Sequence, residues 1–291
     1  RVESGQSGEL VLGMASLELE DIDPVVDGTG WDWGDRALYC AHVAWMVKEI
    51  GWVLLIPEIS LPSGFIAALL VVFGLALHLR RRRFAANLCE LVMGIWLCSN
   101  VLWMTSEVLF DDPDVKFPWH LVPVLEGDHE FTYDVLSSIS AKGFFAAVLL
   151  YVVGLAVLFH PSCRERGVVG NTLLQCYLCS WCLKDYFWAE EEFWPAICTD
   201  LITVPMLLYN IHIETTLRGS HWRQFAWVSW SLANGVWIIG ELKFPGVMEF
   251  NISAAILLLI ALVLLVCGYD IYKETEQKNV CLDDSCPESD G

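Results

Sequence analysis

Eight apolar segments alternate with polar stretches between residues 37 and 272. Most of them approach the ~20 residues that an α-helix needs to cross the hydrocarbon core of a bilayer. The pattern therefore predicts an all-α polytopic membrane protein with about eight transmembrane helices. The predicted segments are 37–56, 62–79, 86–109, 139–160, 171–194, 197–214, 222–243 and 250–272.

Lys and Arg residues are concentrated in the loops that follow the even-numbered segments. Because cytosolic loops carry an excess of Lys and Arg, both termini are expected in the cytosol. The chain then divides into an acidic cytosolic segment over 1–36, a transmembrane domain over 37–277 and a polar cytosolic tail over 278–291. The basic residues are Arg80 to Arg83, Arg164 and Arg166, Arg218 and Arg223, and Lys273 and Lys278.

Composition agrees with a membrane location and narrows the range of partners. Hydrophobic residues make up 55% of the chain, and the mean hydropathy is +0.49. The formal net charge is -19 at pH 7, so nucleic-acid phosphates would be repelled and no nucleic-acid partner is expected. The lipid bilayer is the expected partner, and the acidic segment 1–36 is a candidate contact surface for another protein.

A Trp-based motif occurs four times, once in each odd-numbered segment. Trp is followed four residues later by Glu, Asp or Asn, and three residues further on by a second Trp. Three copies add a Glu after four more residues, whereas the first copy has Ile56 there. Such a repeat indicates that one structural unit recurs in the fold. The copies are Trp45, Glu49 and Trp52; Trp96, Asn100, Trp103 and Glu107; Trp181, Asp185, Trp188 and Glu192; and Trp230, Asn234, Trp237 and Glu241.

Each motif segment is followed by a plainer apolar segment, so the repeating unit is predicted to be a helical hairpin. The four hairpins cover approximately 37–80, 86–161, 171–216 and 222–273. All four have the same predicted orientation, which favours parallel repeats around an axis along the membrane normal. Copies one and three have Lys before the acid, whereas copies two and four have a small residue before Asn. This alternation indicates that a pair of hairpins was duplicated.

On an α-helix the four motif positions lie on one narrow stripe. An ionisable side chain near the bilayer centre costs at least ~2.5 kcal/mol, so stripes with Glu49 and Asp185 are expected to face one another. The motif helices are therefore predicted to lie inside and the return helices outside. The stripes then stack four sets of side chains, ordered from the cytosolic half outward: a first Trp tier, a polar tier, a second Trp tier and an outer set of carboxylates. The sets are Trp45, Trp96, Trp181 and Trp230; Glu49, Asn100, Asp185 and Asn234; Trp52, Trp103, Trp188 and Trp237; and Glu107, Glu192 and Glu241.

This stacking favours a transporter or channel-like protein that binds or moves a small cation or cationic organic solute along the repeat axis. Carboxylates attract cations to a vestibule, and Trp faces bind organic ammonium groups through cation–π contact. Lys48 and Lys184 complicate this interpretation, because they can neutralise Glu49 and Asp185. One alternative is that the stripes are hydrogen-bonded packing groups in a structural or assembly subunit of a membrane complex.

A second alternative is a membrane-embedded redox protein that binds haem. His78, His160 and His212 fall at the cytosolic ends of return segments, and a membrane b-type haem needs two His side chains that face each other at one depth. Apart from this alternative no cofactor is predicted, and no metal site. The chain has no nucleotide-binding loop, nucleophile elbow or zincin motif, which favours a non-enzymatic function.

Overall fold

The computed structural model describes residues 33–79, 84–111, 129–159, 176–218 and 222–283. These residues form helices and the turns between them, and they contain no β-strand. The all-α prediction is therefore confirmed for the described part of the chain. Nearly all of the acidic segment predicted over 1–36 lies outside the described residues.

Eight α-helices and one π-helical turn make up the described residues. The π-helical turn η1 continues α4 directly, so that these two elements form one rod. The elements are α2 Trp33–Val53, α3 Pro57–Leu79, α4 Phe84–Ser106, η1 Glu107–Asp111, α5 His129–Phe159, α7 Tyr177–Ala189, α8 Phe193–Arg218, α9 Trp222–Lys243 and α10 Met248–Asp283.

The helices differ from the predicted segments mainly at their ends. α3 begins at Pro57 and α5 at His129, earlier than predicted, and α10 continues to Asp283, into the predicted polar tail. α7 ends earlier than predicted, at Ala189. Apolarity marks only the part of a helix that lies in apolar surroundings, whereas backbone hydrogen bonds extend a helix through polar residues as well.

The turn after α2 and the turn after α7 reverse the chain in the same way. Leu55 and Glu191 adopt left-handed φ values of 56° and 59°. In each turn the next residue donates its N–H to a carbonyl five residues back, which is the pattern of a Schellman motif. These bonds are Ile56 to Gly51 at 2.7 Å and Glu192 to Phe187 at 2.8 Å.

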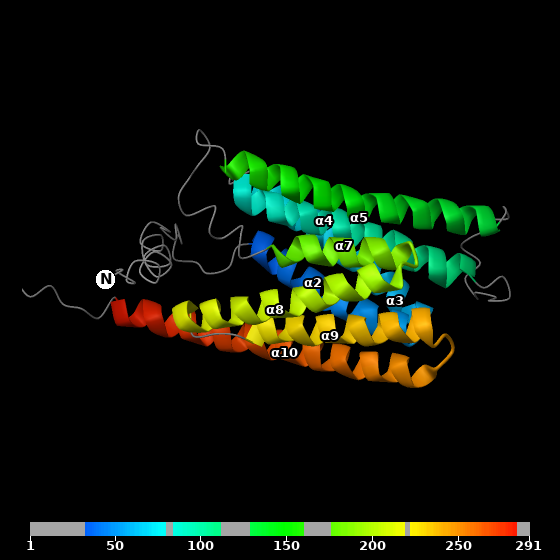
Figure 1. Cartoon of the computed structure of the whole chain (residues 1–291). Coiled ribbons are helices and arrows are strands. Elements are labelled where there is room, and N and C mark those ends of the chain that lie inside the picture. The colour runs from blue at the N-terminus through cyan, green and yellow to red at the C-terminus, as the bar shows by residue number, and fades with distance from the viewer. Residues whose placement is uncertain (1–32, 80–83, 112–128, 160–175, 219–221, 284–291) are drawn as a thin grey trace, which may run out of the picture.

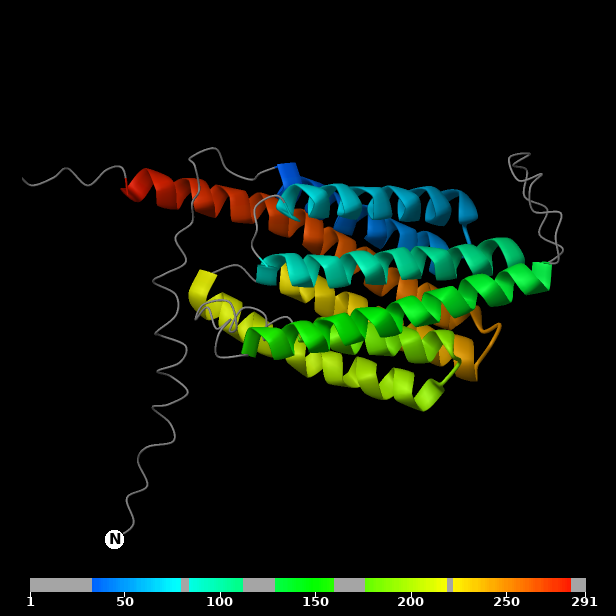
Figure 2. The ribbon, with the colours of Figure 1, turned by 90° about the horizontal axis from the view of Figure 1, so that it is seen from above.

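The helices run side by side along one bundle (Figures 1 and 2). The motif helices α2, α4, α7 and α9 meet at the centre. Each of the return helices α3, α5, α8 and α10 packs against the motif helix that precedes it and against the next motif helix, with α10 packing on α2. The turns after α7 and after α9 lie at the same end of the bundle (Figure 1).

The return helices present apolar side chains on the outside of the bundle. On α3, α5, α8 and α10, the residues Leu69, Val153, Leu201 and Ile256 are 70%, 59%, 64% and 55% exposed. Within the described residues, α3, α4, α5 and α10 contain a stretch long and apolar enough to cross a membrane. The other four helices, α2, α7, α8 and α9, are shorter or more polar than these stretches.

Candidate functional site

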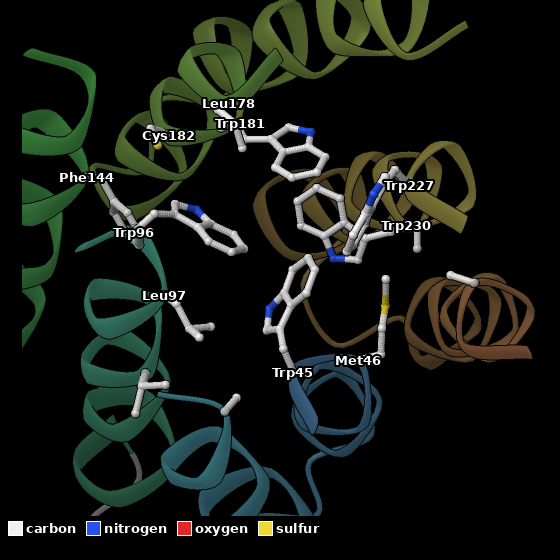
Figure 3. Packing of buried hydrophobic residues seen from close by; sticks show 14 of the residues in the cluster. Trp45, Met46, Trp96, Leu97, Phe144, Leu178, Trp181, Cys182, Trp227 and Trp230 are labelled. Atoms are coloured by element: carbon white, nitrogen blue, oxygen red, sulfur yellow. The ribbon is translucent and has the colours of Figure 1, made fainter. Parts of the chain in front are cut away.

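The first Trp tier forms a cluster at the centre of the bundle (Figure 3). Each of its four side chains comes from a different motif helix and is 1% exposed. The ring centroids lie 5.0 Å apart for Trp45 and Trp96, 4.8 Å for Trp45 and Trp230, 4.6 Å for Trp181 and Trp230, and 6.2 Å for Trp96 and Trp181. At such separations aromatic rings attract each other beyond the effect of burial alone. The tier therefore ties all four motif helices together.

The second Trp tier is a closed cycle of four buried rings. Each ring meets its two neighbours edge to face, at centroid distances between 4.9 and 5.2 Å and interplanar angles between 85° and 89°. The order around the cycle is Trp52, Trp103, Trp188 and Trp237, which follows the order of the helices in the chain. The stripes predicted from the sequence thus meet at two levels.

Between the two Trp tiers, Lys48 joins α2 to α4. Its Nζ atom lies 2.6 Å from Oε1 of Glu49 and donates to Oδ1 of Asn100 on α4. The same Nζ lies 4.3 Å from the ring centroid of Trp52. The ammonium group is therefore held by a carboxylate, an amide oxygen and an aromatic face.

Lys184 repeats this arrangement between α7 and α9. Its Nζ atom lies 2.6 Å from Oδ1 of Asp185 and donates to Oδ1 of Asn234 at 2.8 Å. The Nζ atom lies 4.8 Å from the ring centroid of Trp230 and 5.2 Å from that of Trp188. The polar tier therefore consists of two similar halves, each built around one ammonium group.

The two carboxylates of the polar tier differ in the indole that they bind. Glu49 accepts the Nε1–H of Trp45, one turn earlier on the same helix, at 2.8 Å. Asp185 instead accepts the Nε1–H of Trp96 on α4, at 2.5 Å. The two carboxylates therefore bind indoles on different helices, although they hold equivalent positions in the motif. The bond from Trp96 to Asp185 connects the two halves of the polar tier.

The polar tier and its two Lys residues carry no net charge. Lys48 and Glu49 are 0% and 2% exposed, and Lys184 and Asp185 are 0% and 1% exposed. A buried charge is costly unless it is both paired and hydrogen-bonded. The Lys residues thus neutralise the two acids, which is the complication that the sequence raised.

Three buried indole groups donate to no acceptor among the described residues. They are Nε1 of Trp181, Trp188 and Trp230. An unpaired buried donor costs ~1–3 kcal/mol. Trp188 and Trp230 are the two rings next to Lys184, so the unused donors gather in the Asp185 half of the polar tier.

The predicted outer carboxylates are not gathered closely enough to form a metal site, and their role in attracting cations stays a prediction. Among the described residues, no group of three or more His, Cys, Asp or Glu side chains is close enough to hold a metal ion. Glu107 lies in η1 and accepts the Nε1–H of Trp52 at 3.0 Å. Glu192 is exposed in the turn after α7 because that helix ends at Ala189, and Glu241 is half-buried on α9.

The three His residues of the haem alternative cannot be compared as a set. His160 lies outside the described residues, and so does the side chain of His78. His212 is exposed on α8. The described part of the chain therefore does not test a facing pair of His ligands.

Trp227 belongs to the buried core, although it is not part of the repeated Trp motif. Its ring lies 5.6 Å from the rings of both Trp45 and Trp181, and 5.1 Å from the ring of His42. Trp227 precedes Trp230 by one helical turn and therefore shares its face of α9. This spacing was the available signal, but it occurs only in the fourth copy.

A second buried polar group, the Asp200 cluster, consists of Asp200, Ser231, Ser180 and Thr203. Asp200 of α8 is 4% exposed, and its Oδ1 accepts the hydroxyl of Ser231 on α9 at 2.8 Å. Thr203 donates to the hydroxyl of Ser180 on α7 at 2.8 Å. The motif search missed this cluster because Asp200 lies on a return helix.

Comparisons of the chain with models of protein families, with curated proteins and with solved structures found no match. The function is therefore inferred from the side chains themselves.

Proposed function

We propose that the protein is an eight-helix membrane carrier that binds a small cation or cationic organic solute in its polar tier. One observation carries the proposal: the motif helices bury two carboxylates and two ammonium groups between two tiers of Trp rings. Ionised groups are costly inside a membrane domain and typically mark a solute or ion pathway there. The apolar outer faces of all four return helices support placement of the bundle in lipid.

The inferred architecture is four parallel hairpin repeats with eight membrane-spanning helices. Three observations support it. The turns after α2 and α7 share one hydrogen-bond pattern, the second Trp tier is a nearly regular cycle, and each return helix packs between consecutive motif helices. The cyclic order of the motif helices is the order expected of parallel repeats about an axis along the membrane normal.

The two Lys ammonium groups indicate which chemistry the polar tier accommodates. Each lies against a carboxylate and within 4.8 Å of a Trp ring centroid, and these groups are the ones that recognise organic ammonium ions. A cationic solute would replace one Lys ammonium at its carboxylate. The displaced Lys would keep its Asn acceptor.

The Asp185 half is the better candidate for this exchange. Lys184 and Asp185 both interact electrostatically with Asp200, so a displaced Lys184 has a second carboxylate available. Lys184, Asp185, Asp200 and one bound monovalent cation together carry no net charge. The unpaired indole donors of Trp188 and Trp230 in this half favour a solute that also carries an oxygen acceptor.

Both Trp tiers are closely packed, which favours a carrier over an open channel. A solute held between the tiers is separated from both membrane faces by a layer of Trp rings. Admission therefore requires one tier to open, as in alternating access, where one part of a bundle moves against another around a fixed site.

The same neutral, closely packed tier supports a second candidate function, that of a structural or assembly subunit. The Lys–carboxylate pairs and Trp contacts would then only fix the register of the helices, as buried polar groups do in some systems. The two functions differ in whether loss of a carboxylate's charge abolishes solute binding without unfolding the protein.

Binding is tested with the full chain in lipid nanodiscs, with choline, tetramethylammonium and guanidinium as probes and potassium chloride as the background salt. The readout is Trp fluorescence, because the Trp tiers surround the polar tier. The proposal predicts saturable quenching by at least one probe. It also predicts at least a tenfold weaker affinity in Asp185→Asn, which keeps the side-chain volume but removes the charge.

Glu249→Gln is the matched control, because it removes one carboxylate that is exposed on α10 and should leave probe affinity unchanged. Near-UV circular dichroism of each variant establishes that it is folded. Equal affinities in Asp185→Asn and wild type would remove Asp185 from the site. No saturable response to any probe would favour the structural subunit.

A further inference from the structure

Asp200 is a buried carboxylate on α8. The two buried Lys residues of the described chain pair with other acids, Lys48 with Glu49 and Lys184 with Asp185, and Lys184 acts on Asp200 only at longer range. Among the described residues, the hydroxyl of Ser231 is the hydrogen-bond donor to Asp200. A buried carboxylate with a single neutral donor is poorly compensated unless it binds a cation.

Further hydroxyl groups lie on the helices beside this carboxylate, although of the described residues only Ser231 donates to it directly. Thr203 lies one helical turn after Asp200 on α8, so the two side chains share a face. Its hydroxyl lies 2.8 Å from the Ser180 oxygen and 2.9 Å from the carbonyl oxygen of Thr199, either of which can accept its one proton. The Ser180 hydroxyl donates to the same carbonyl at 2.7 Å. Because a hydroxyl has two acceptor lone pairs, the oxygens of Thr203, Ser180 and Ser231 can still act as ligands.

Gly235 leaves the space that the carboxylate occupies. A Cβ atom at this position would lie 2.7 Å from Oδ2 of Asp200, closer than real side chains approach. The carboxylate therefore enters the α8–α9 interface only because α9 has a Gly there. This is a specific fit between a buried acid and a missing side chain.

The equivalent place in the first half of the chain has no oxygen ligands. Asp200 follows the left-handed turn residue Glu191 by nine positions, as Gly64 follows Leu55. A Cβ atom on Gly64 would lie 3.4 Å from Val101, which follows the motif Asn just as Gly235 does. In the first half the return helix therefore has the small residue, Gly64, and the motif helix has the larger one, Val101. In the second half the return helix has the larger residue, Asp200, and the motif helix has Gly235.

The remaining members of the cluster differ in the same way. The positions in the first half that are equivalent to Ser231, Ser180 and Thr203 hold apolar residues, so these three hydroxyl groups occur in one of the two interfaces. The equivalent pairs are Leu97 for Ser231, Ala44 for Ser180 and Ala67 for Thr203. Helix packing alone is therefore satisfied without these oxygens, and their joint presence needs another explanation.

We infer that the Asp200 cluster is a binding site for an alkali-metal cation of the Na⁺ type. Carboxylate and hydroxyl oxygens are hard ligands that suit hard cations. A single carboxylate matches the charge of a monovalent ion, whereas divalent sites in proteins usually gather several carboxylates. The ligands come from α7, α8 and α9, so the ion would hold three helices together.

Ion binding at Asp200 stands independently of the proposed solute site, but the two would compete where both exist. An ion at Asp200 balances the carboxylate while Lys184 stays on Asp185. A solute at Asp185 would send Lys184 toward Asp200 and thereby expel the ion. Binding of solute and ion would then be mutually exclusive, which is the requirement for exchange transport.

Thermal unfolding of the full chain in nanodiscs tests the ion site directly. The melting temperature is measured in sodium, lithium, potassium and choline chloride at constant ionic strength and at several pH values. Ligand that binds only the folded protein raises the melting temperature with concentration. We expect a saturable rise in sodium chloride that exceeds the rise in potassium or choline chloride, and that is lost in Asp200→Asn.

Two further variants keep the carboxylate, so they serve if Asp200→Asn fails to fold. Thr203→Val and Ser231→Ala each remove one hydroxyl and should raise the half-saturating sodium concentration severalfold, whereas Glu249→Gln should leave it unchanged. Equal melting temperatures in all four salts would overturn the inference. A melting temperature that depends on pH in the same way in every salt would also overturn it, because Asp200 would then bind only a proton. The sodium-dependent rise in melting temperature reports on the ion site, whereas the fluorescence titration with choline reports on the solute site. The two proposals can therefore fail separately.

Discussion

The Lys48–Glu49 pair allows a double-mutant cycle whose outcome follows from its contacts. Glu49→Gln removes the counter-charge of an ammonium group that is 0% exposed, and loss of one partner of a buried pair costs ~3–5 kcal/mol. Two contacts that remain reduce this cost. The Nζ atom keeps its bond to Asn100, and it lies 4.3 Å from the Trp52 ring centroid. A cation–π contact of this kind is worth up to ~2 kcal/mol when it is desolvated. We therefore expect Glu49→Gln to lower the free energy of unfolding by about 3 kcal/mol.

The second change should reverse most of this loss. Lys48→Met in the Glu49→Gln background removes the stranded ammonium and replaces it with an unbranched apolar side chain. The amide oxygen that Glu49→Gln introduces can still accept the Nε1–H that Trp45 donates to Glu49 at 2.8 Å. The amide oxygen of Asn100 loses its donor, at a cost of ~1 kcal/mol. The double mutant should therefore be within about 1 kcal/mol of wild type.

Equilibrium unfolding in detergent micelles, followed by Trp fluorescence, measures the four free energies of the cycle. The coupling energy between the two positions should be at least ~2 kcal/mol. Additive effects of the two changes would refute the reasoning, because the ion pair would then contribute nothing specific to the fold. Glu249→Gln on the exposed face of α10 is the control, and it should change the unfolding free energy by less than ~0.5 kcal/mol.

Three further predictions concern topology and packing. Cysteine introduced at Glu191 should react with an impermeant maleimide from outside and cysteine at Ser220 from the cytosolic side, so labelling of both from one side would contradict the eight-helix topology. Glu191→Gly should raise the free energy of unfolding by ~1 kcal/mol, because φ is 59° there; an unchanged midpoint of denaturation would argue against a strained turn. Gly143→Ala should destabilise the protein by ~1–3 kcal/mol, because the new Cβ would overlap Oγ of Ser99. Adding Ser99→Ala should recover part of the lost free energy of unfolding. If it does not in the same denaturation series, the clash does not involve Ser99.

The tiers at the centre of the bundle could be predicted from sequence because they depend on helical periodicity alone. Positions four, seven and eleven residues apart return to one face of a helix, so four copies of one pattern were enough to place Trp45, Trp96, Trp181 and Trp230 together. Burial of the charged residues followed from the cost of exposing them to lipid. Neither step needed information about the partner of any particular side chain.

Hydrogen-bond partners and helix ends could not be predicted in this way. The motif treats Glu49 and Asp185 as equivalent, yet Glu49 accepts from Trp45 on its own helix and Asp185 accepts from Trp96 on α4. The motif also places Glu192 on the stripe of α7, but the left-handed residue Glu191 ends that helix first. Asp200 could not be found from helical periodicity, because the hydroxyl groups near it on α7 and α9 are not part of a repeated pattern.

The alternation of Lys–acid and Asn copies explains why the polar tier has two halves and not four equal quarters. Four Lys–acid copies would bring four ammonium groups and four carboxylates to one axis, and each further buried ion pair carries a desolvation cost. Asn in copies two and four instead offers a neutral acceptor to the Lys of the preceding motif helix, as Asn100 does for Lys48 and Asn234 for Lys184. Once the halves are separate in this way, one can diverge from the other without unbalancing the centre. The Asp185 half differs from the Lys48 half in three ways: it has the shorter acid, the unpaired indoles of Trp188 and Trp230 and the neighbouring Asp200 cluster. Under the proposed function, a change confined to this half should alter solute binding while the Lys48 half continues to hold α2 against α4.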